Sequence, residues 1–115
     1  MMAADVQKYV EDIKKYTTHV KEDVVSAIVR HCGIALHNRD SSLVAASDPE
    51  ELKTVRESWL KKKLALTDSD ADLDKAIHAV MEKMKGERAK GRVTVYYLLA
   101  EHYHKLEGLV KPAKA

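Results

Sequence analysis

The sequence contains one cysteine, four glycines and two prolines in 115 residues. Because Cys32 is alone, no intrachain disulfide can form, which is typical of a reducing compartment. The few glycines and prolines supply little of the turn chemistry that sheet-rich domains need. No apolar run approaches the roughly 18 residues that span a bilayer, and the N-terminus does not resemble a secretory signal. The sequence therefore predicts a cytoplasmic protein without membrane contact.

What the sequence does contain is a balanced mixture of apolar and charged side chains. Apolar residues make up 45% of the chain and charged residues 33%, and the formal net charge is +2. This composition is sufficient for one hydrophobic core. We expect a single helical domain over residues 1–110 and a flexible C-terminal tail at residues 111–115. A net charge this small does not by itself indicate a nucleic-acid-binding protein.

Apolar residues recur every three or four positions, as they do in amphipathic helices. The pattern predicts an all-α fold, a single compact domain of about five short helices packed as an irregular or orthogonal bundle. The helix expected over residues 19–32 is apolar around most of its circumference, because Val25 and Val29 widen its apolar face. A helix of this kind is usually central, so we expect it to form the middle of the bundle.

Local chemistry predicts the boundaries of two further helices. Ser47 and Glu50 have the spacing of a capping box, in which each side chain bonds the backbone N–H of the other residue. Residues 93–97 have strand-like composition. The only similar segment is Leu43–Val44, so we favour a helix from about residue 92 to 107. Residues 43–46 are then expected to form a short helical turn packed on the core.

Two motifs resemble parts of metal sites. Residues 68–72 (Asp-Ser-Asp-Ala-Asp) resemble the start of a calcium loop, but Leu73 and Ala79 occupy the positions that need glycine and glutamate. Glu101 and His104 have the spacing of half a di-iron helix, but the chain has no second motif of this kind. We therefore predict no metal or other cofactor, and we interpret the aspartates as favourable charges at a helix N-terminus.

The remaining candidates for chemistry, His31, His102 and Cys32, are expected to be packed rather than reactive. Both histidines fall on apolar helix faces, and if they are neutral in the folded protein its stability should fall in acid. Cys32 is expected at a helix C-terminus, where the helix dipole disfavours a thiolate. We interpret it as a small buried apolar residue.

Two surfaces are candidates for binding. The basic side chains of one connector are candidate phosphate contacts: Lys83, Lys85, Arg88, Lys90 and Arg92. A second surface combines Tyr97 with Glu101 and His104, because an exposed tyrosine among polar groups can anchor a protein partner. The alternatives are that the lysines form a solvated face and that Tyr97 packs beneath the connector.

Several short strings occur together in a characteristic combination. They are Asp40 to Ala45, Ser47-Asp48 with Glu51-Leu52 and Val55, Lys62-Lys63-Leu64, and Tyr96 to Ala100. Over residues 40–103 the sequence thereby resembles a small bacterial protein family that is described as a domain of unknown function. The resemblance implies a small helical protein of the bacterial cytosol, and it assigns no catalytic residues.

These observations predict a non-enzymatic interaction or regulatory module that binds a protein partner or a second copy of itself. The first alternative is a weak nucleic-acid-binding protein that uses residues 83–92, although the low net charge makes nucleic acid the less favoured partner. The second alternative is an enzyme whose site assembles from scattered side chains, which sequence motifs do not detect.

Overall fold

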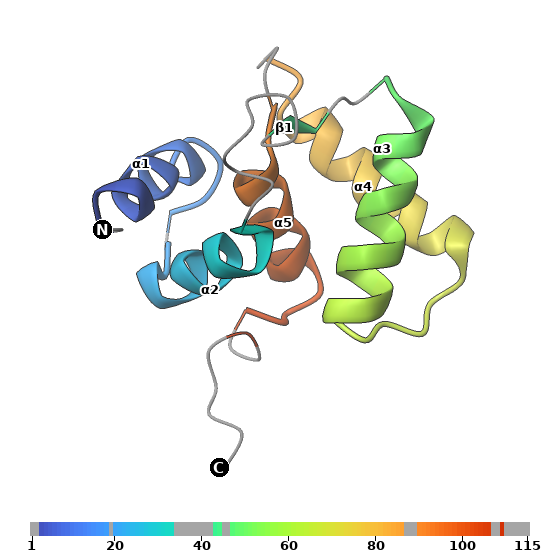
Figure 1. Cartoon of the computed structure of the whole chain (residues 1–115). Coiled ribbons are helices and arrows are strands. Elements are labelled where there is room, and N and C mark those ends of the chain that lie inside the picture. Colours follow the sequence, from blue (N-terminus) through green and yellow to red (C-terminus); the bar gives the residue numbers. More distant parts are fainter. Residues whose placement is uncertain are drawn as a thin grey trace.

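The structure, a computed structural model, describes residues 3–18, 20–33, 43–44, 47–86, 90–106 and 109. Within these residues the chain forms one compact domain of five helices, as the sequence predicted (Figure 1). The elements in chain order are α1 (Ala3–Ile13), α2 (Glu22–Cys32), β1 (Leu43–Val44), α3 (Pro49–Thr54), the π-helix η2 (Val55–Lys63), α4 (Asp70–Lys83), β2 (Lys90–Gly91) and α5 (Arg92–His102). Because α3 continues directly into η2, the two form a single helix in space. The predicted tail at residues 111–115 lies outside the described residues.

The central helix of the molecule is α5. All of its residues from 92 to 100 are buried, because α1 and α2 pack on one side of it while η2 and α4 pack on the other (Figure 1). The expectation that residues 19–32 form the central helix is wrong, since α2 buries one face only. Apolar and aromatic side chains follow one another along α5 without a polar stripe, and such a helix requires neighbours on all sides. No helix in the described part of the chain has both the length and the hydropathy to cross a membrane.

A short antiparallel strand pair joins the segment before α3 to the start of α5. Leu43 lies opposite Gly91, and Val44 lies opposite Lys90. Residues 93–97 are helical, as we expected despite their strand-like composition. The expected helical turn at residues 43 and 44 is wrong, because their backbone groups pair with β2 instead. Residues 45 and 46 of that turn lie outside the described residues.

Side-chain caps begin α3 and α4. The Asp48 carboxylate accepts a hydrogen bond of 3.0 Å from the N–H of Glu50, so the predicted capping box with Ser47 as the cap is wrong by one residue. The Ser69 hydroxyl accepts a hydrogen bond of 3.2 Å from the N–H of Asp72, within the aspartate-rich run that the sequence predicted to lie at a helix N-terminus. Each cap provides a partner for a first-turn N–H group that has none within its helix.

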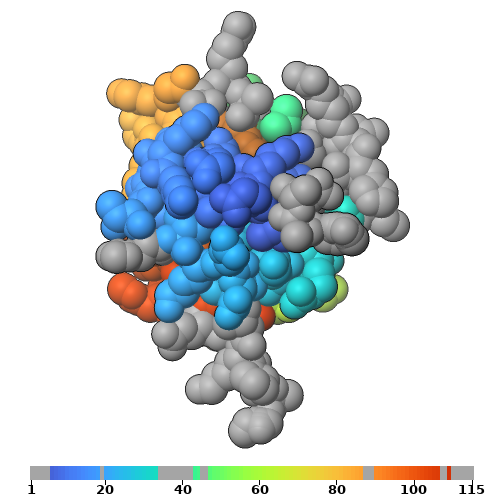
Figure 2. Space-filling model, turned by 90° about the vertical axis from the view of Figure 1, so that its left-hand side faces the viewer, coloured from blue at the N-terminus to red at the C-terminus, as the bar shows by residue number. Residues whose placement is uncertain are grey.

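The α1 and α2 helices form one face of the molecule (Figure 2). Hydrogen bonds from side chains attach this face to α5. The backbone N–H of Lys21 donates to the Tyr97 hydroxyl at 3.0 Å, and the Thr17 hydroxyl donates to the Glu101 carboxylate at 2.7 Å. The loop between α1 and α2 is therefore held along the length of the central helix.

On the opposite side, Trp59 of η2 makes the main aromatic contact with α5. Its ring is 0% exposed and stacks on Tyr96, with the ring centroids 4.4 Å apart and the planes inclined by 14°. Its Nε1 donates to the backbone oxygen of Tyr96 at 3.1 Å. A bond of 2.9 Å from the N–H of Leu64 to the Trp59 oxygen closes the wide turn of the π-helix. These contacts hold η2 in place and position the wall of the groove described next.

Candidate functional site

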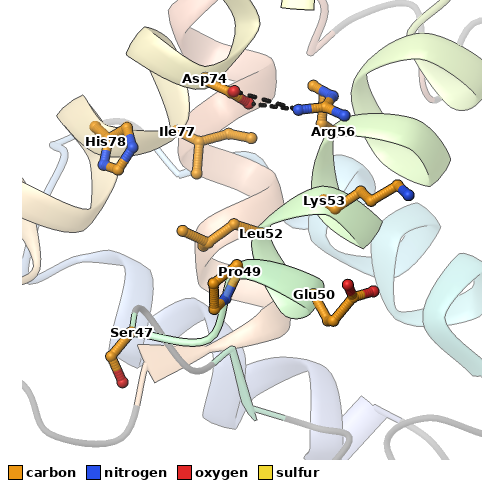
Figure 3. A pocket seen from close by; sticks show the side chains of 9 residues that line it. All are labelled: Ser47, Pro49, Glu50, Leu52, Lys53, Arg56, Asp74, Ile77 and His78. Atoms are coloured by element: carbon orange, nitrogen blue, oxygen red, sulfur yellow. Dashed lines mark hydrogen bonds and ion pairs between the residues drawn. The ribbon is translucent and has the colours of Figure 1, made fainter.

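A groove of about 490 Å³ lies between the continuous α3–η2 helix and α4 (Figure 3). Its lining residues are Ser47, Pro49, Glu50, Leu52, Lys53, Arg56, Asp74, Ile77 and His78. On both helices these residues recur at intervals of three and four, the spacing that places side chains on one helix face. Each helix therefore contributes one of its faces to a wall of the groove.

The floor of the groove is apolar. Pro49 and Leu52 come from α3, and Leu52 is half-buried and packs against the core. Ile77 of α4 is only 1% exposed and belongs to the core itself. The floor is therefore continuous with the folded interior, and the shape of the groove depends on the packing of α3 against α4.

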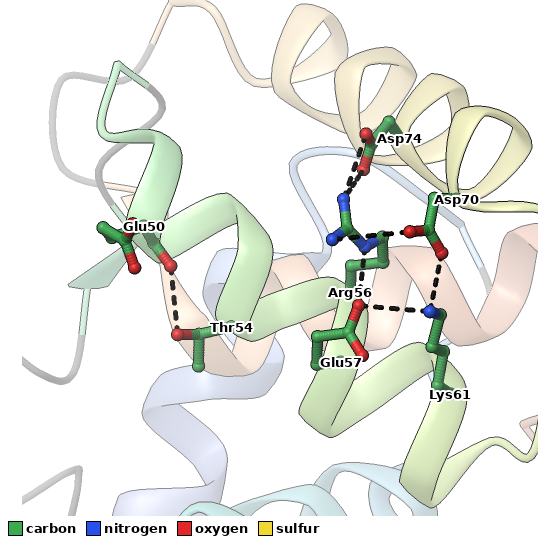
Figure 4. Close-up of polar contacts among 7 residues, drawn as sticks. All are labelled: Glu50, Thr54, Arg56, Glu57, Lys61, Asp70 and Asp74. Carbon is green, nitrogen blue, oxygen red and sulfur yellow. Dashed lines mark hydrogen bonds and ion pairs between the residues drawn. The ribbon is translucent and has the colours of Figure 1, made fainter.

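One end of the groove is closed by a salt bridge between its two walls. Nη1 of Arg56 lies 3.1 and 3.2 Å from the two carboxylate oxygens of Asp74, and its Nε lies 2.9 Å from Glu57 (Figure 4). The Arg56 side chain is only 16% exposed. The hydrogen bond to Glu57, followed by the bond to Asp74, raises the pKa of Arg56 above its ordinary value. The guanidinium therefore stays charged, and the bridge persists at neutral pH.

Two further charges, Lys61 and Asp70, extend this network along η2 and α4. Lys61 Nζ lies 2.6 Å from Asp70 and 3.2 Å from Glu57. The hydrogen bond from Lys61 lowers the pKa of Asp70, and the bond to Asp70 raises the pKa of Lys61. Water and salt weaken ion pairs at the surface, so the network orients η2 against α4 and contributes less to stability than the buried floor.

Three polar side chains in the groove, Glu50, Lys53 and His78, make no ion pair with any described residue. All three are exposed. Glu50 and Lys53 lie one turn apart on α3, and His78 lies on the wall formed by α4 (Figure 3). An apolar floor bordered by charges without intramolecular partners is an arrangement that a binding partner can complete.

The groove also contains the residue types of a hydrolytic triad without its geometry. In a triad an acidic residue orients a histidine, which accepts the proton of a serine hydroxyl. Here both carboxylate oxygens of Asp74 accept hydrogen bonds from Arg56, and no hydrogen bond links His78 to Ser47 or Asp74. The described residues likewise include no group of three or more His, Cys, Asp or Glu side chains that could hold a metal ion.

The predicted surface of Tyr97, Glu101 and His104 does not form as expected. Tyr97 is 0% exposed, and burial raises the pKa of its hydroxyl. Its hydroxyl and the Glu101 carboxylate accept the hydrogen bonds from the α1–α2 loop described above, while His104 is exposed beyond the end of α5. The expectation of an exposed tyrosine is wrong, because the α1–α2 loop covers the side of α5 that carries Tyr97 and Glu101.

The predicted row of phosphate contacts is also divided by the fold. Lys83 and Lys85 are exposed, Arg88 lies outside the described residues, and Lys90 and Arg92 are 9% and 6% exposed. The Arg92 guanidinium donates to Glu51 at 2.9 Å, to the Leu43 backbone oxygen at 3.2 Å and to the Tyr96 hydroxyl at 3.2 Å. It therefore joins β1, α3 and α5 inside the molecule, and the expectation that Lys90 and Arg92 face phosphates is wrong.

The histidines and the cysteine lie elsewhere. His31 and His102 are both exposed, contrary to the expectation of core histidines. The His31 ring nevertheless lies 5.0 Å from the Trp59 ring, and burial, followed by the nearby charge of Lys63, lowers its pKa. Cys32 is partly buried, which raises its thiol pKa to about 11 even though the Arg92 charge acts in the opposite direction. A thiol with this pKa is a poor nucleophile at neutral pH.

None of the groove residues is among the site residues that the sequence predicted. Leu52 has the spacing of an ordinary core residue of its helix, and Lys53 resembles many other surface lysines. The one local signal is the stripe formed by Pro49, Leu52, Lys53 and Arg56, which mixes apolar and charged residues on one helix face. Finding the groove also requires knowing that α4 lies beside this stripe.

The family comparison covers nearly the whole described chain, including the N-terminal helices. The family model described as Protein of unknown function (DUF2853) matches residues 8–107. No curated protein matches the sequence. The match covers more of the chain than the resemblance noted over residues 40–103, so α2 and most of α1 are part of the same domain. The chain belongs to the family described as Protein of unknown function (DUF2853).

Proposed function

We propose that this protein is a non-enzymatic interaction module of the bacterial cytoplasm, and that it binds a segment of a protein in the groove between the α3–η2 helix and α4. The observation that carries the proposal is the combination of an apolar floor with exposed charges that have no intramolecular partner. Leu52 contributes to the floor, and Glu50 and Lys53 are the nearest charges. The single cysteine, and hence the lack of any intrachain disulfide, supports the compartment.

The groove has the residue spacing of a site that accepts side chains of a helical segment. Its volume of about 490 Å³ lies within the range of roughly 300–1,000 Å³ that is usual for pockets that take small ligands, which is enough for a few side chains of a partner. Helix-in-groove recognition places apolar anchors at intervals of three and four residues against a hydrophobic floor, and the lining of this groove has the same intervals. The charges on its rim contribute to specificity and orientation more than to affinity.

Selection of short peptides from a random displayed library on the immobilised protein tests this proposal. Peptides that become enriched are titrated by calorimetry against the wild type and against Lys53→Glu and Lys75→Glu. Lys75→Glu is the matched control, because Lys75 is also exposed but lies outside the groove. We expect Lys53→Glu to weaken binding about tenfold, or about 1.4 kcal/mol, and Lys75→Glu to have no effect.

A second variant tests the floor of the groove. Leu52→Asp places a charge against the apolar floor and should abolish peptide binding, because a buried charge without a partner is strongly unfavourable. Thermal unfolding followed by circular dichroism checks that this variant is folded. Failure to enrich any peptide, or equal affinity of the enriched peptides for the wild type and both groove variants, would refute binding in the groove.

A further inference from the structure

We infer that η2 contains one residue more than an α-helix with the same buried side chains would need, and that this extra residue positions Arg56 for the salt bridge that closes the groove. The inference rests on the proposed function, because it assigns a positioning role at the same groove. It is carried by the spacing of the buried and the charged residues of η2.

The buried side chains of η2 and its last turn have the spacing of a π-helix. They follow one another at intervals of four, one and four residues: Val55, Trp59, Leu60 and Leu64. An α-helix turns by about 100° per residue, so it would place Leu60 about 140° and Leu64 about 180° away from Val55. In the wider π-helix the same intervals return to one side, and all four side chains are 5% exposed or less. Burial therefore selects the π winding for this sequence.

The charged side of η2 uses the same wide turn. Arg56 and Lys61 are five residues apart, yet both contact one carboxylate. Nη2 of Arg56 lies 3.7 Å and Nζ of Lys61 lies 2.6 Å from the oxygens of Asp70 (Figure 4). In an α-helix these two cations would point about 140° apart. The ion-pair network at the end of the groove therefore depends on the winding of η2.

Ser58 is the residue that the core does not need. It is exposed, and its side chain forms no hydrogen bond or ion pair with a described residue. Without Ser58, the buried side chains would follow at intervals of three, one and four residues, which is the spacing of an amphipathic α-helix. The same core could then be covered by an α-helix, which is the far more common winding. Extra residues that widen a helix are frequent at functional sites, and the groove is the site beside this one.

The extra residue changes the direction in which Arg56 points. Trp59 is anchored in the core by its stack on Tyr96 and its hydrogen bond to the Tyr96 backbone oxygen. Arg56 precedes Trp59 by three residues, which turn by about 245° in a π-helix. After deletion of Ser58 it would precede Trp59 by two residues, which turn by about 200° in an α-helix. The deletion therefore rotates Arg56 by about 45° around the helix, away from the position in which Nη1 lies 3.1 Å from Asp74.

Deletion of Ser58 tests whether this residue is extra. Scalar couplings across hydrogen bonds, measured by NMR, identify the acceptor of each backbone N–H in η2. In the wild type the N–H of Leu64 pairs with the oxygen of Trp59, five residues before it, and in the deletion variant we expect pairing four residues back. The Tm should rise by about 4 °C or more, because a more favourable helix covers the same core. Ser58→Ala keeps the number of residues and is the matched control, which should change neither result.

A thermodynamic cycle tests the position of Arg56. Asp74→Asn removes the charge with which Arg56 pairs, so it should lower the Tm of the wild type by about 2–4 °C. In the Ser58 deletion variant the bridge is already broken, and Asp74→Asn should leave the Tm unchanged. Peptides selected on the wild type should bind the deletion variant about tenfold more weakly, although that variant is more stable. A general structural defect would instead lower stability and affinity together.

Four results overturn the inference. They are a deletion variant that unfolds or is less stable than the wild type, retention of pairing five residues back, an equal effect of Asp74→Asn in both backgrounds, and undiminished affinity of the deletion variant for the selected peptides. A failure of the proposed function has a different outcome. If no peptide is enriched, binding in the groove is refuted, whereas the couplings and the cycle still decide whether the extra residue positions Arg56.

Discussion

The two sides of the central helix α5 are held by different kinds of contact. On the α1–α2 side, single side-chain hydrogen bonds join residues that lie 76 to 84 positions apart in the sequence. These bonds are Thr17–Glu101, Lys21–Tyr97 and Asp12–Thr94. On the other side, α5 is held by the stack of Trp59 on Tyr96 and the hydrogen bond from Trp59 to the Tyr96 backbone oxygen, and by the bonds from Arg92 to Glu51 and Leu43. The ion pairs around Arg56 join η2 to α4.

This difference bears on the place of the proposed binding site. On the α1–α2 side, the polar groups of α5 that the sequence marks as candidate contacts, Tyr97 and Glu101, are bonded within the molecule. On the other side, the α3–η2 helix and α4 diverge enough to leave a groove, and Glu50 and Lys53 remain available beside it. The proposed binding site therefore uses residues other than those that hold α5, and the following substitutions test how α5 is held.

The largest expected effect is on the η2 side. Trp59→Ala removes a fully buried ring, its stack on Tyr96 and its hydrogen bond to the Tyr96 backbone oxygen. A substitution of this kind lowers the free energy of unfolding by about 3–5 kcal/mol, which urea denaturation followed by circular dichroism measures. A loss smaller than that of Tyr97→Phe, which removes one hydrogen bond on the α1–α2 side, would contradict the contrast between the two sides of α5.

A smaller effect is expected at the connection between β1, α3 and α5. Arg92→Met keeps most of the apolar stem of the side chain but removes the bonds to Glu51 and to the Leu43 backbone oxygen. We expect a loss of about 1–3 kcal/mol, the usual result of leaving a partly buried polar group without its charged partner. The measurement is the same urea titration. An unchanged urea midpoint would show that water replaces the hydrogen bonds of the guanidinium with no loss in the free energy of unfolding.

On the α1–α2 side, Tyr97→Phe isolates one of the hydrogen bonds. The ring stays in place, but the backbone N–H of Lys21 loses its acceptor. We expect a loss of about 1 kcal/mol in the free energy of unfolding. Hydrogen exchange at the Lys21 amide is the sharper measurement, because its protection should fall in Tyr97→Phe while that of amides in α4 stays unchanged. Equal loss of protection in both regions would contradict a local role.

The smallest effect concerns pH. Burial and Lys63 lower the pKa of His31 below its ordinary value of 6.5, so the folded protein binds a proton there less readily than the unfolded chain. The contribution of His31 to stability is therefore complete above about pH 6.5 and decreases as the pH falls through the lowered pKa. Trp59 is the only tryptophan and contacts His31, so its fluorescence should titrate with a midpoint below 6.5.

The variant His31→Gln should remove this transition and the matching part of the acid destabilisation. The other described histidines serve as an internal control, since His78 and His104 have no ring contact with Trp59. A fluorescence transition that persists unchanged in His31→Gln would assign the titration to a different group, and the contact between α2 and η2 would then have no role in the pH response.

The parts of the fold that could be predicted from the sequence are those set by near neighbours. The helices, the start of α4 at Ser69 and the helical state of residues 93–97 depend on spacing and composition within a few turns. The central position of α5 could not be predicted in this way. The α2 sequence is apolar around much of its circumference, yet Val29 is only partly buried where it packs against the core.

The candidate site depended more strongly on long-range packing. Arg92 and Lys53 are both basic residues near the ends of helices, and residue type alone does not show which of them is buried. The guanidinium of Arg92 is buried in contact with Glu51, 41 positions away, whereas Lys53 is an exposed residue at the border of the groove. The direction in which a charged side chain points is therefore decided by which other helix lies beside it.

The sequence by itself determined an all-α domain without disulfides, with helices at nearly the observed positions, because helical periodicity and capping act over three or four residues. Only the tertiary structure decided which helix is central, which polar groups are bonded internally, and which charges remain on the wall of the groove. Those outcomes depend on contacts between residues tens of positions apart, whose free energy comes from burial and pairing in the folded molecule.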